Sequence, residues 1–368
     1  MSVAAPAIAL RGWDCIELWV GNARTTAGFL ASAFGFRCTG YAGPETGVAD
    51  RASYVLEQGT VRLVVSAALD AGSPIADHVR RHGDGVHDLA WLVDDVAGAY
   101  AAAVNRGARG VRGPWREGEG DQTLELAQIA TFGETVHTFV GRDRFHGAVL
   151  APGYVAEDLP NPEGAEDVGI VEIDHVVGNV EQGRLDEWVR FYRDVLGFET
   201  VQQFDQDRIR TEHSALRSTV MSNGAGITMP LNEPAEGRKR SQIQEYLDHY
   251  DGPGVQHIAL RTDDIVSTVR ALRARGVRFM DVPDTYYEDT RRRLASFALP
   301  WDALQELRIL ADQDHDGYLL QIFTETVTDR PALFFEIIER RGASGFGEGN
   351  FKALFEAIER DQARRGHL

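Results

Sequence analysis

Apolar and polar positions along this chain follow two periods, one helical and one typical of strands. Residues 185–197 and 265–276 each carry apolar side chains at helical spacing and then a glycine suited to cap the helix. Residues 171–177, 255–259 and 334–338 instead read as short, strongly apolar strands with a few polar interruptions. The pattern therefore predicts an α+β chain, in which short amphipathic helices connect buried strands.

An internal repeat organises these elements. Residues 85–96 (GVHDLAWLVDDV) resemble residues 254–265 (GVQHIALRTDDI), and the same offset of 169 residues also relates 103–108 to 272–277. This period is far longer than the repeat of a solenoid protein. We therefore expect two duplicated α+β domains.

A Pro/Gly-rich stretch without periodicity separates the two repeats and is typical of a linker. We predict an N-terminal domain at residues 10–150, a linker at 151–168 and a C-terminal domain at 169–368.

Composition narrows the range of partners. Lys and Arg number 38 against 56 Asp and Glu, a formal net charge of −18. Such acidity disfavours nucleic acid and anionic membrane surfaces as partners. No apolar run approaches the length of a spanning helix, and the N-terminus has no basic signal-peptide region. With only two cysteines in addition, we expect a reduced, cytoplasmic protein.

Three polar residues interrupt the apolar strands: His175, His257 and Glu336. Each could be structural, since a single buried histidine is usually a core residue and Glu336 could pair with Arg340 or Arg341. Together, two histidines and one carboxylate match the facial triad of non-haem Fe(II) enzymes, which leaves metal positions open for substrate and oxygen.

The first repeat provides an internal control for these three residues. Aligned through the repeat and through a Val-Gly-Asn match at 20–22 and 177–179, their counterparts are, in order, Leu18, Asp88 and Thr138. Because residues required by the fold tend to persist in both copies, this difference favours a metal role confined to the second half.

Several longer motifs occur in a recognisable order. They are residues 173–180, 230–234, 240–247, 254–260, 319–324, 335–340 and 345–351. Through them the chain resembles the 4-hydroxyphenylpyruvate dioxygenase family of the vicinal oxygen chelate superfamily, from about residue 12 to the C-terminus. The resemblance implies two domains of paired βαβββ modules and a C-terminal lid helix, which begins near Phe351.

The resemblance also implies a site. The ligands of Fe(II) would be His175, His257 and Glu336. A polar lining would orient the substrate, and aromatic walls would hold its ring; the matching residues are Ser218, Asn232, Gln242, Gln256, Gln321, Phe323, Phe334, Phe346 and Phe351. Taken one by one, these residues could equally serve ordinary hydrogen bonding and core packing.

The implied activity converts 4-hydroxyphenylpyruvate and O2 to homogentisate and CO2, a step of tyrosine and phenylalanine catabolism. The substrate's own 2-oxo acid would chelate the iron, so no separate oxo acid is implied. We also expect a homodimer or homotetramer.

Three rival functions share the superfamily. 4-Hydroxymandelate synthase uses the same substrate but attacks the benzylic carbon; Phe351 and the Pro-Leu-Asn at 230–232 argue against it. A metal-free binding protein would not need the triad. An extradiol dioxygenase would act on catechols, and it is disfavoured by the motifs at 321–324 and 345–351.

One segment departs from the family pattern. His213 and Arg217 stand where the family has an aromatic and an apolar residue. Alternation along the strand predicts that Arg217 faces outward; an inward Arg217 would put the substrate preference in doubt.

Overall fold

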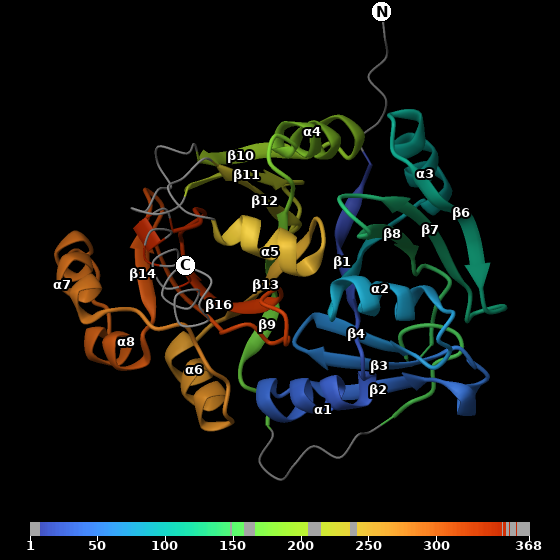
Figure 1. The fold of residues 1–368 in the computed structure, drawn as a ribbon, viewed down its shortest axis with the longest axis horizontal. Helices are drawn as coiled ribbons and strands as arrows, with labels where there is room; N and C mark the ends of the chain where they lie inside the picture. Colours follow the sequence, from blue (N-terminus) through green and yellow to red (C-terminus); the bar gives the residue numbers. More distant parts are fainter. Residues whose placement is uncertain are drawn as a thin grey trace, which may run out of the picture.

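Two eight-stranded sheets with the same strand order lie side by side (Figure 1). They are seen in a computed structural model that describes residues 8–147, 149–157, 166–204, 215–235, 241–347, 349–350, 353 and 358. The first sheet has the order β2-β3-β4-β1-β5-β8-β7-β6, and the second repeats it as β10-β11-β12-β9-β13-β16-β15-β14. Each half is a pair of βαβββ modules, which confirms the predicted α+β duplication.

The first sheet and its helices come from the N-terminal half. Its strands are β1 (Leu10–Trp19), β2 (Arg37–Ala42), β3 (Arg51–Gln58), β4 (Val61–Ala68), β5 (Gly85–Val93), β6 (Gly110–Glu117), β7 (Leu124–Ala130) and β8 (Val136–Gly141). Its helices are α1 (Ala23–Phe34), the 3-10 turn η1 (Pro44–Thr46), α2 (Pro74–His82) and α3 (Val96–Asn105).

The second half follows the same plan with more helix. Its strands are β9 (Ile170–Asn179), β10 (Glu199–Phe204), β11 (Ala215–Ser222), β12 (Thr228–Ala235), β13 (Gly254–Thr262), β14 (Leu310–Gln313), β15 (Tyr318–Phe323) and β16 (Phe334–Arg341). Its helices are α4 (Leu185–Arg190), the π-helical η2 (Phe191–Val195), α5 (Gln242–Tyr250), α6 (Ile265–Ala274), α7 (Asp284–Arg293) and α8 (Trp301–Leu307).

Local sequence determines where the two helical segments predicted at 185–197 and 265–276 begin and end. Asp264 caps α6 by accepting a hydrogen bond from the Ser267 amide at 3.0 Å. The glycines predicted to end the helical segments, Gly197 and Gly276, both adopt positive φ, which ordinary side chains disfavour. The first of these segments is α-helical only as far as Arg190 and continues as the π-helical η2.

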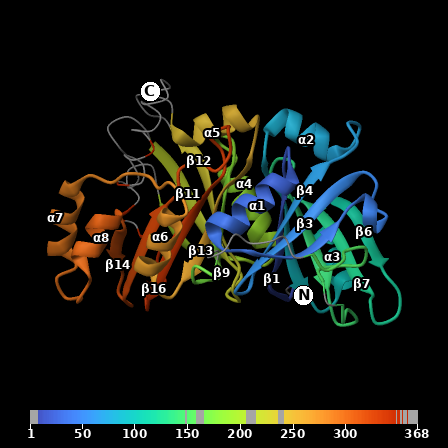
Figure 2. The same ribbon diagram turned by 90° about the horizontal axis from the view of Figure 1, so that it is seen from below.

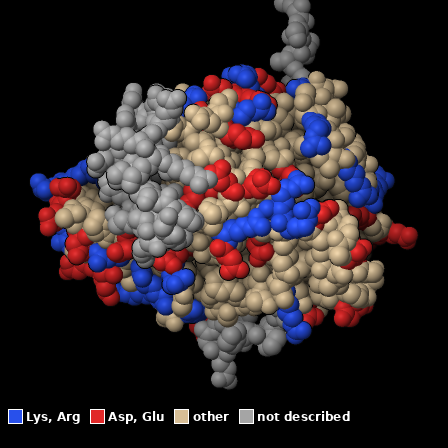
Figure 3. All heavy atoms as spheres, viewed as in Figure 1, with Lys and Arg blue, Asp and Glu red and all other residues tan. Residues whose placement is uncertain are grey.

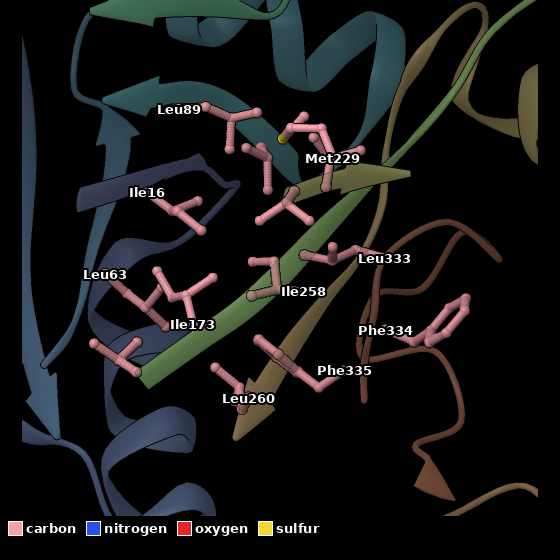
Figure 4. Packing of buried hydrophobic residues seen from close by; sticks show 14 of the residues in the cluster. Ile16, Leu63, Leu89, Ile173, Met229, Ile258, Leu260, Leu333, Phe334 and Phe335 are labelled. Atoms are coloured by element: carbon pink, nitrogen blue, oxygen red, sulfur yellow. The ribbon is translucent and has the colours of Figure 1, made fainter. Parts of the chain in front are cut away.

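A shared apolar core joins the two halves. Figure 4 shows Ile16 and Leu63 of the first half packed towards Ile173, Ile258 and Leu260 of the second, all within one buried cluster. Complete burial of each such side chain contributes roughly 1.5–3 kcal/mol. One face of the second sheet thus contributes to the core shared with the first half, and its other face is left for the site.

Strand pairing corrects one predicted counterpart in the repeat. In the second sheet Ala259 lies opposite His175, and at the same position of the first sheet Ala90 lies opposite Cys15. The counterpart of His175 is therefore Cys15, and the predicted Leu18 is wrong. The tripeptide match that indicated Leu18 lies near the ends of the strands, and it is out of register by three residues.

The predicted counterparts of His257 and Glu336 are confirmed by the register as Asp88 and Thr138. The Thr138 hydroxyl donates a hydrogen bond to Asp88, and its backbone amide donates a second one at 3.1 Å. Burial raises the pKa of Asp88 to about 7. In place of two imidazoles and a carboxylate, the first sheet thus has a thiol, a carboxyl group and a hydroxyl.

An Arg–Asp pair, in contrast, is present in both halves. Arg142 binds the Asp14 carboxylate through Nε and Nη2, the latter at 2.9 Å. At the equivalent position Arg340 binds Asp174 at 2.7 and 2.8 Å. In each half the pair connects the first strand in the sequence (β1 or β9) to the last one (β8 or β16). We therefore assign the pair a structural role.

We predict that Asp14→Ala lowers the free energy of unfolding by about 3 kcal/mol, because the change leaves the Arg142 guanidinium partly buried without its partner. Chemical denaturation measures the loss. The control is Asp94→Ala, whose pair with Arg11 is more than half exposed and should contribute less than about 1 kcal/mol. Equal losses in the two variants would contradict this assignment.

Candidate metal centre

Three neighbouring strands bring the predicted metal ligands together. His175 on β9, His257 on β13 and Glu336 on β16 are each at least 94% buried. The Oε2 atom of Glu336 lies 3.2 Å from Nε2 of His175 and 3.3 Å from Nε2 of His257. The parallel pairing of β13 with β16 aligns Ala259 with Glu336, and the antiparallel pairing of β13 with β9 aligns it with His175.

The other nitrogen of each imidazole has its own acceptor. Nδ1 of His175 lies 2.7 Å from the Asp174 carboxylate, and Nδ1 of His257 lies 3.0 Å from Oε1 of Gln256. Hydrogen bonds donated from Nδ1 leave the lone pair on Nε2, the atom that faces Glu336. Both rings are therefore held in the tautomer that a metal ligand needs.

The arginines proposed as structural partners of Glu336 lie elsewhere. Arg340 binds Asp174, and Arg341 binds Glu339 at 2.7 Å. Among the described residues, the ion-pair partners of the Glu336 carboxylate are the two imidazoles. The explanation of Glu336 as half of an Arg–Glu pair is wrong.

The electrostatics of the cluster favour a bound cation. Burial lowers the pKa of His175, but the carboxylates of Glu336 and Asp174 outweigh it and raise the pKa to about 9. Burial lowers the pKa of His257. Burial by itself would raise the pKa of Glu336, but the two imidazoles outweigh it and lower that pKa. Without a metal, the carboxylate thus retains a proton on His175 as its counter-charge. A divalent ion can displace that proton.

The donor set fits a divalent metal ion. The ligand atoms of the three residues all lie within 4.8 Å of one another. Two imidazoles and one carboxylate without a thiolate are typical of a catalytic centre with open positions. All three side chains also line a cavity of about 550 Å³, part of which is open to solvent. An ion held here would face that space.

Most of the predicted substrate-binding residues line the same cavity. They are Ser218, Asn232, Gln242, Gln256, Gln321, Phe323 and Phe346. Strands β11, β12, β13 and β15 provide five of them, and helix α5 provides Gln242.

Two predicted aromatic residues differ from these. Phe334 does not line the cavity; its ring stacks on His257 with centroids 4.8 Å apart and an interplanar angle of 22°. It therefore supports a candidate ligand, and its role as a wall for the substrate stays a prediction. Phe351, like most of the predicted lid helix, lies outside the described residues, although the helical Ile358 lines the cavity.

A β-bulge places Gln256 in the site. The register of β13 against β9 shifts between Val255 and His257, so strict alternation fails there. Both Gln256 and His257 consequently face the cavity. Alternation alone had grouped His257 with Val255, which instead belongs to the shared core.

Several buried polar atoms around the cavity have no hydrogen-bond partner among the described residues. They include Oγ of Ser218, Oε1 of Gln242 and Oε1 of Gln321. Because an unsatisfied buried polar group is costly, native proteins rarely retain one without a ligand or water. A polar ligand or ordered water at these positions would satisfy them.

Sequence reasoning missed the apolar part of the lining, which includes Val177, Leu216, Pro230, Ile243 and Ile338. Strand alternation from the named residues could have found several of them, since Leu216 lies two residues from Ser218 and Ile338 two from Glu336.

The departure at Arg217 is resolved. Its guanidinium binds Glu233 at 2.5 Å and Asp186 at 3.0 Å, on the side away from the cavity. The predicted outward orientation is confirmed, so Arg217 gives no reason to revise the substrate. His213 lies outside the described residues.

Comparison with known proteins gives a consistent result. Models of the Glyoxalase/Bleomycin resistance protein/Dioxygenase superfamily match residues 14–124 and 172–322, one in each repeat. A 4-hydroxyphenylpyruvate dioxygenase from Yarrowia lipolytica is 46% identical over 97% of this chain and 94% of its own. One from Dictyostelium discoideum is 45% identical over 98% of this chain and all of its own. The chain belongs to the 4-hydroxyphenylpyruvate dioxygenase family.

A solved structure extends this family assignment to the fold. A triple mutant of 4-hydroxymandelate synthase from Streptomyces coelicolor superposes with a TM-score of 0.85 at 37% identity, covering 97% of this chain and 99% of its own.

Among the described residues, no helix is both long and apolar enough to cross a membrane.

We predict that Glu336→Gln weakens binding of a divalent metal at this centre at least about 100-fold, because the substitution removes the only anionic ligand of the three. Isothermal titration of the metal-free protein measures the affinity. Glu339→Gln, on the same strand but outside the cavity, is the control and should bind as the wild type does. Unchanged affinity in Glu336→Gln would show that the metal binds elsewhere.

Proposed function

We propose that this protein is an Fe(II)-dependent dioxygenase that converts 4-hydroxyphenylpyruvate and O2 to homogentisate and CO2. The observation that carries the proposal is the buried pair of imidazoles with one carboxylate, which opens into a cavity of mixed character. Identity above 40% over nearly the whole length to enzymes of that name supports the substrate. The reaction belongs to tyrosine catabolism.

Iron is the metal we propose for the three ligands His175, His257 and Glu336. Two histidines and one carboxylate form the facial donor set of non-haem Fe(II) oxygenases. When bound, Fe(II) would supply chelation of the 2-oxo acid and activation of dioxygen.

The chain's own residues provide binding and orientation of the substrate. The amides of Gln242 and Gln321 and the hydroxyl of Ser218 are available for polar groups of the substrate. Phe323 and Phe346 place aromatic faces beside the imidazoles, with ring centroids 5.9 Å from His257 and 5.1 Å from His175. Such a cavity suits an aromatic ring that carries polar groups at both ends.

A second candidate is 4-hydroxymandelate synthase, favoured by the close structural match to that enzyme. It would use the same ligands and the same substrate, and it would differ only in which carbon is hydroxylated. Higher sequence identity to the dioxygenases favours homogentisate as the product.

A product assay tests this proposal. The metal-free protein is loaded with Fe(II) without oxygen, 4-hydroxyphenylpyruvate and then O2 are added, and the product is identified by chromatography and mass spectrometry. Homogentisate is expected. 4-Hydroxymandelate would transfer the assignment to the synthase, and failure to consume oxygen with iron bound would overturn both candidates.

We predict that Gln242→Leu lowers kcat/KM about 10–100-fold with unchanged metal affinity, because the change removes one buried polar partner of the substrate. Steady-state kinetics and metal titration provide the two readouts. The matched control is Gln244→Leu, two residues along α5, whose side chain donates a hydrogen bond to Asp248 at 2.8 Å on the surface and does not line the cavity. Similar kinetic losses in both variants would exclude a specific role for Gln242.

Three further expectations stay predictions: the domain boundaries, the cytoplasmic location and assembly into a homodimer or homotetramer.

A further inference from the structure

A second group of two histidines and one glutamate lies in the N-terminal half. His78 and His82 stand one turn apart on α2, and Glu134 comes from the turn between β7 and β8. Residues four apart on a helix present their side chains on the same face, which is the spacing at which helical histidine pairs bind zinc. This group lies far from His175, His257 and Glu336 in the sequence, and the proposed dioxygenase reaction does not use it.

The ligand atoms lie within 4.8 Å of one another, close enough for a single ion to bind all three after a small shift of His78. Oε2 of Glu134 lies 3.1 Å from Nε2 of His82 and 3.9 Å from Nδ1 of His78. Zinc bonds of 2.0–2.1 Å in tetrahedral geometry would separate two ligand atoms by about 3.3 Å. The corresponding distances to Glu336 in the first cluster, 3.2 and 3.3 Å, fall in the same range.

The imidazole of His82 is held with the correct nitrogen free. Its Nδ1 lies 2.5 Å from the carbonyl oxygen of Tyr250 on α5, so Nδ1 carries the proton and donates a hydrogen bond to that carbonyl. The lone pair is then on Nε2, which points at Glu134. A backbone carbonyl behind a histidine is the usual support of a metal ligand.

His78 carries the stronger indication of a missing partner. Its side chain is 98% buried, and neither ring nitrogen has a hydrogen-bond partner among the described residues. Aromatic rings of Trp19, His82, His87 and Tyr250 surround it. Its Nδ1 nevertheless points toward Glu134, where a cation would satisfy it.

The surroundings leave one carboxylate oxygen available. Arg81 donates a hydrogen bond to Oε1 of Glu134, so Oε2 alone faces the imidazoles. Figure 3 shows basic side chains gathered over α2 and its border with α5, where Arg330 donates to the carbonyl oxygens of Arg80 and Arg81. Glu134 is 41% exposed, which gives an ion a route from solvent.

We propose that His78, His82 and Glu134 form a second metal site that binds Zn²⁺, with water in the remaining position. Two imidazoles and one carboxylate suit this ion, and the site needs no redox chemistry. Zinc there would tie α2 to the β7–β8 turn. Because His82 also bonds to Tyr250, it would fix the contact of α2 with α5, which lie side by side in Figures 1 and 2. This proposal does not depend on the dioxygenase activity.

In the test, metal-free protein is incubated with Zn²⁺ and dialysed. Mass spectrometry of the metal then counts the zinc that remains bound. Glu336→Gln provides the background because it weakens the first centre. We expect one equivalent in Glu336→Gln, and at least about 100-fold weaker binding when Glu134→Gln or His82→Asn is added. The matched control adds His146→Asn, which removes an exposed histidine outside both clusters and should leave one equivalent.

A second readout tests the structural role. Zinc should raise the melting temperature of Glu336→Gln but not that of Glu336→Gln with Glu134→Gln. Since Glu134 is partly exposed, its single variant Glu134→Gln should fold, and in the otherwise wild-type chain it should lower bound zinc from two equivalents to one. No binding to Glu336→Gln, or binding unaffected by both ligand changes, would overturn the proposal.

Discussion

The carboxylate of Glu336 is the constraint on which the site depends. It is 97% buried in a strand whose neighbours Phe335 and Ile337 are wholly buried, and its ion-pair partners in the described part of the chain are two imidazoles. An ionised carboxylate is too costly to bury without a cation. Packing of the two sheets against each other excludes water from one face of the second sheet, and the cluster forms on the other face. A proton on one imidazole satisfies the carboxylate in part, and a divalent metal would satisfy all three residues together.

Duplication separates what the fold needs from what the chemistry needs. The Arg–Asp pair that joins the first and last strands occurs in both halves, as Arg142 with Asp14 and as Arg340 with Asp174. The imidazoles do not recur, since Cys15 and Asp88 occupy their positions in the first sheet. Asp174 has both roles, because it binds Arg340 and also orients His175. In the second half, the candidate metal cluster is thus connected through Asp174 to a structural pair that both halves share.

Local pattern and the internal repeat were enough to predict the duplicated α+β architecture and the three buried polar residues, because alternation and glycine caps are encoded within a few residues. Most of the cavity lining, in contrast, was predicted only through the resemblance to the family. Local pattern could not give features created by strand pairing. The bulge that turns Gln256 into the cavity, the register that places Cys15 opposite Ala90 and the choice of Asp174 by Arg340 all depend on contacts between distant segments. For the same reason, the stacking of Phe334 on His257 could not be predicted.

The central claim is that the buried cluster on β9, β13 and β16 holds the catalytic metal. Crystallography of the Fe(II)-loaded protein under anaerobic conditions, with anomalous scattering recorded on both sides of the iron edge, tests it most directly. The account predicts one iron peak bonded to Nε2 of His175, Nε2 of His257 and the Glu336 carboxylate. Iron bound at another position, with these three side chains still paired only to one another, would contradict it.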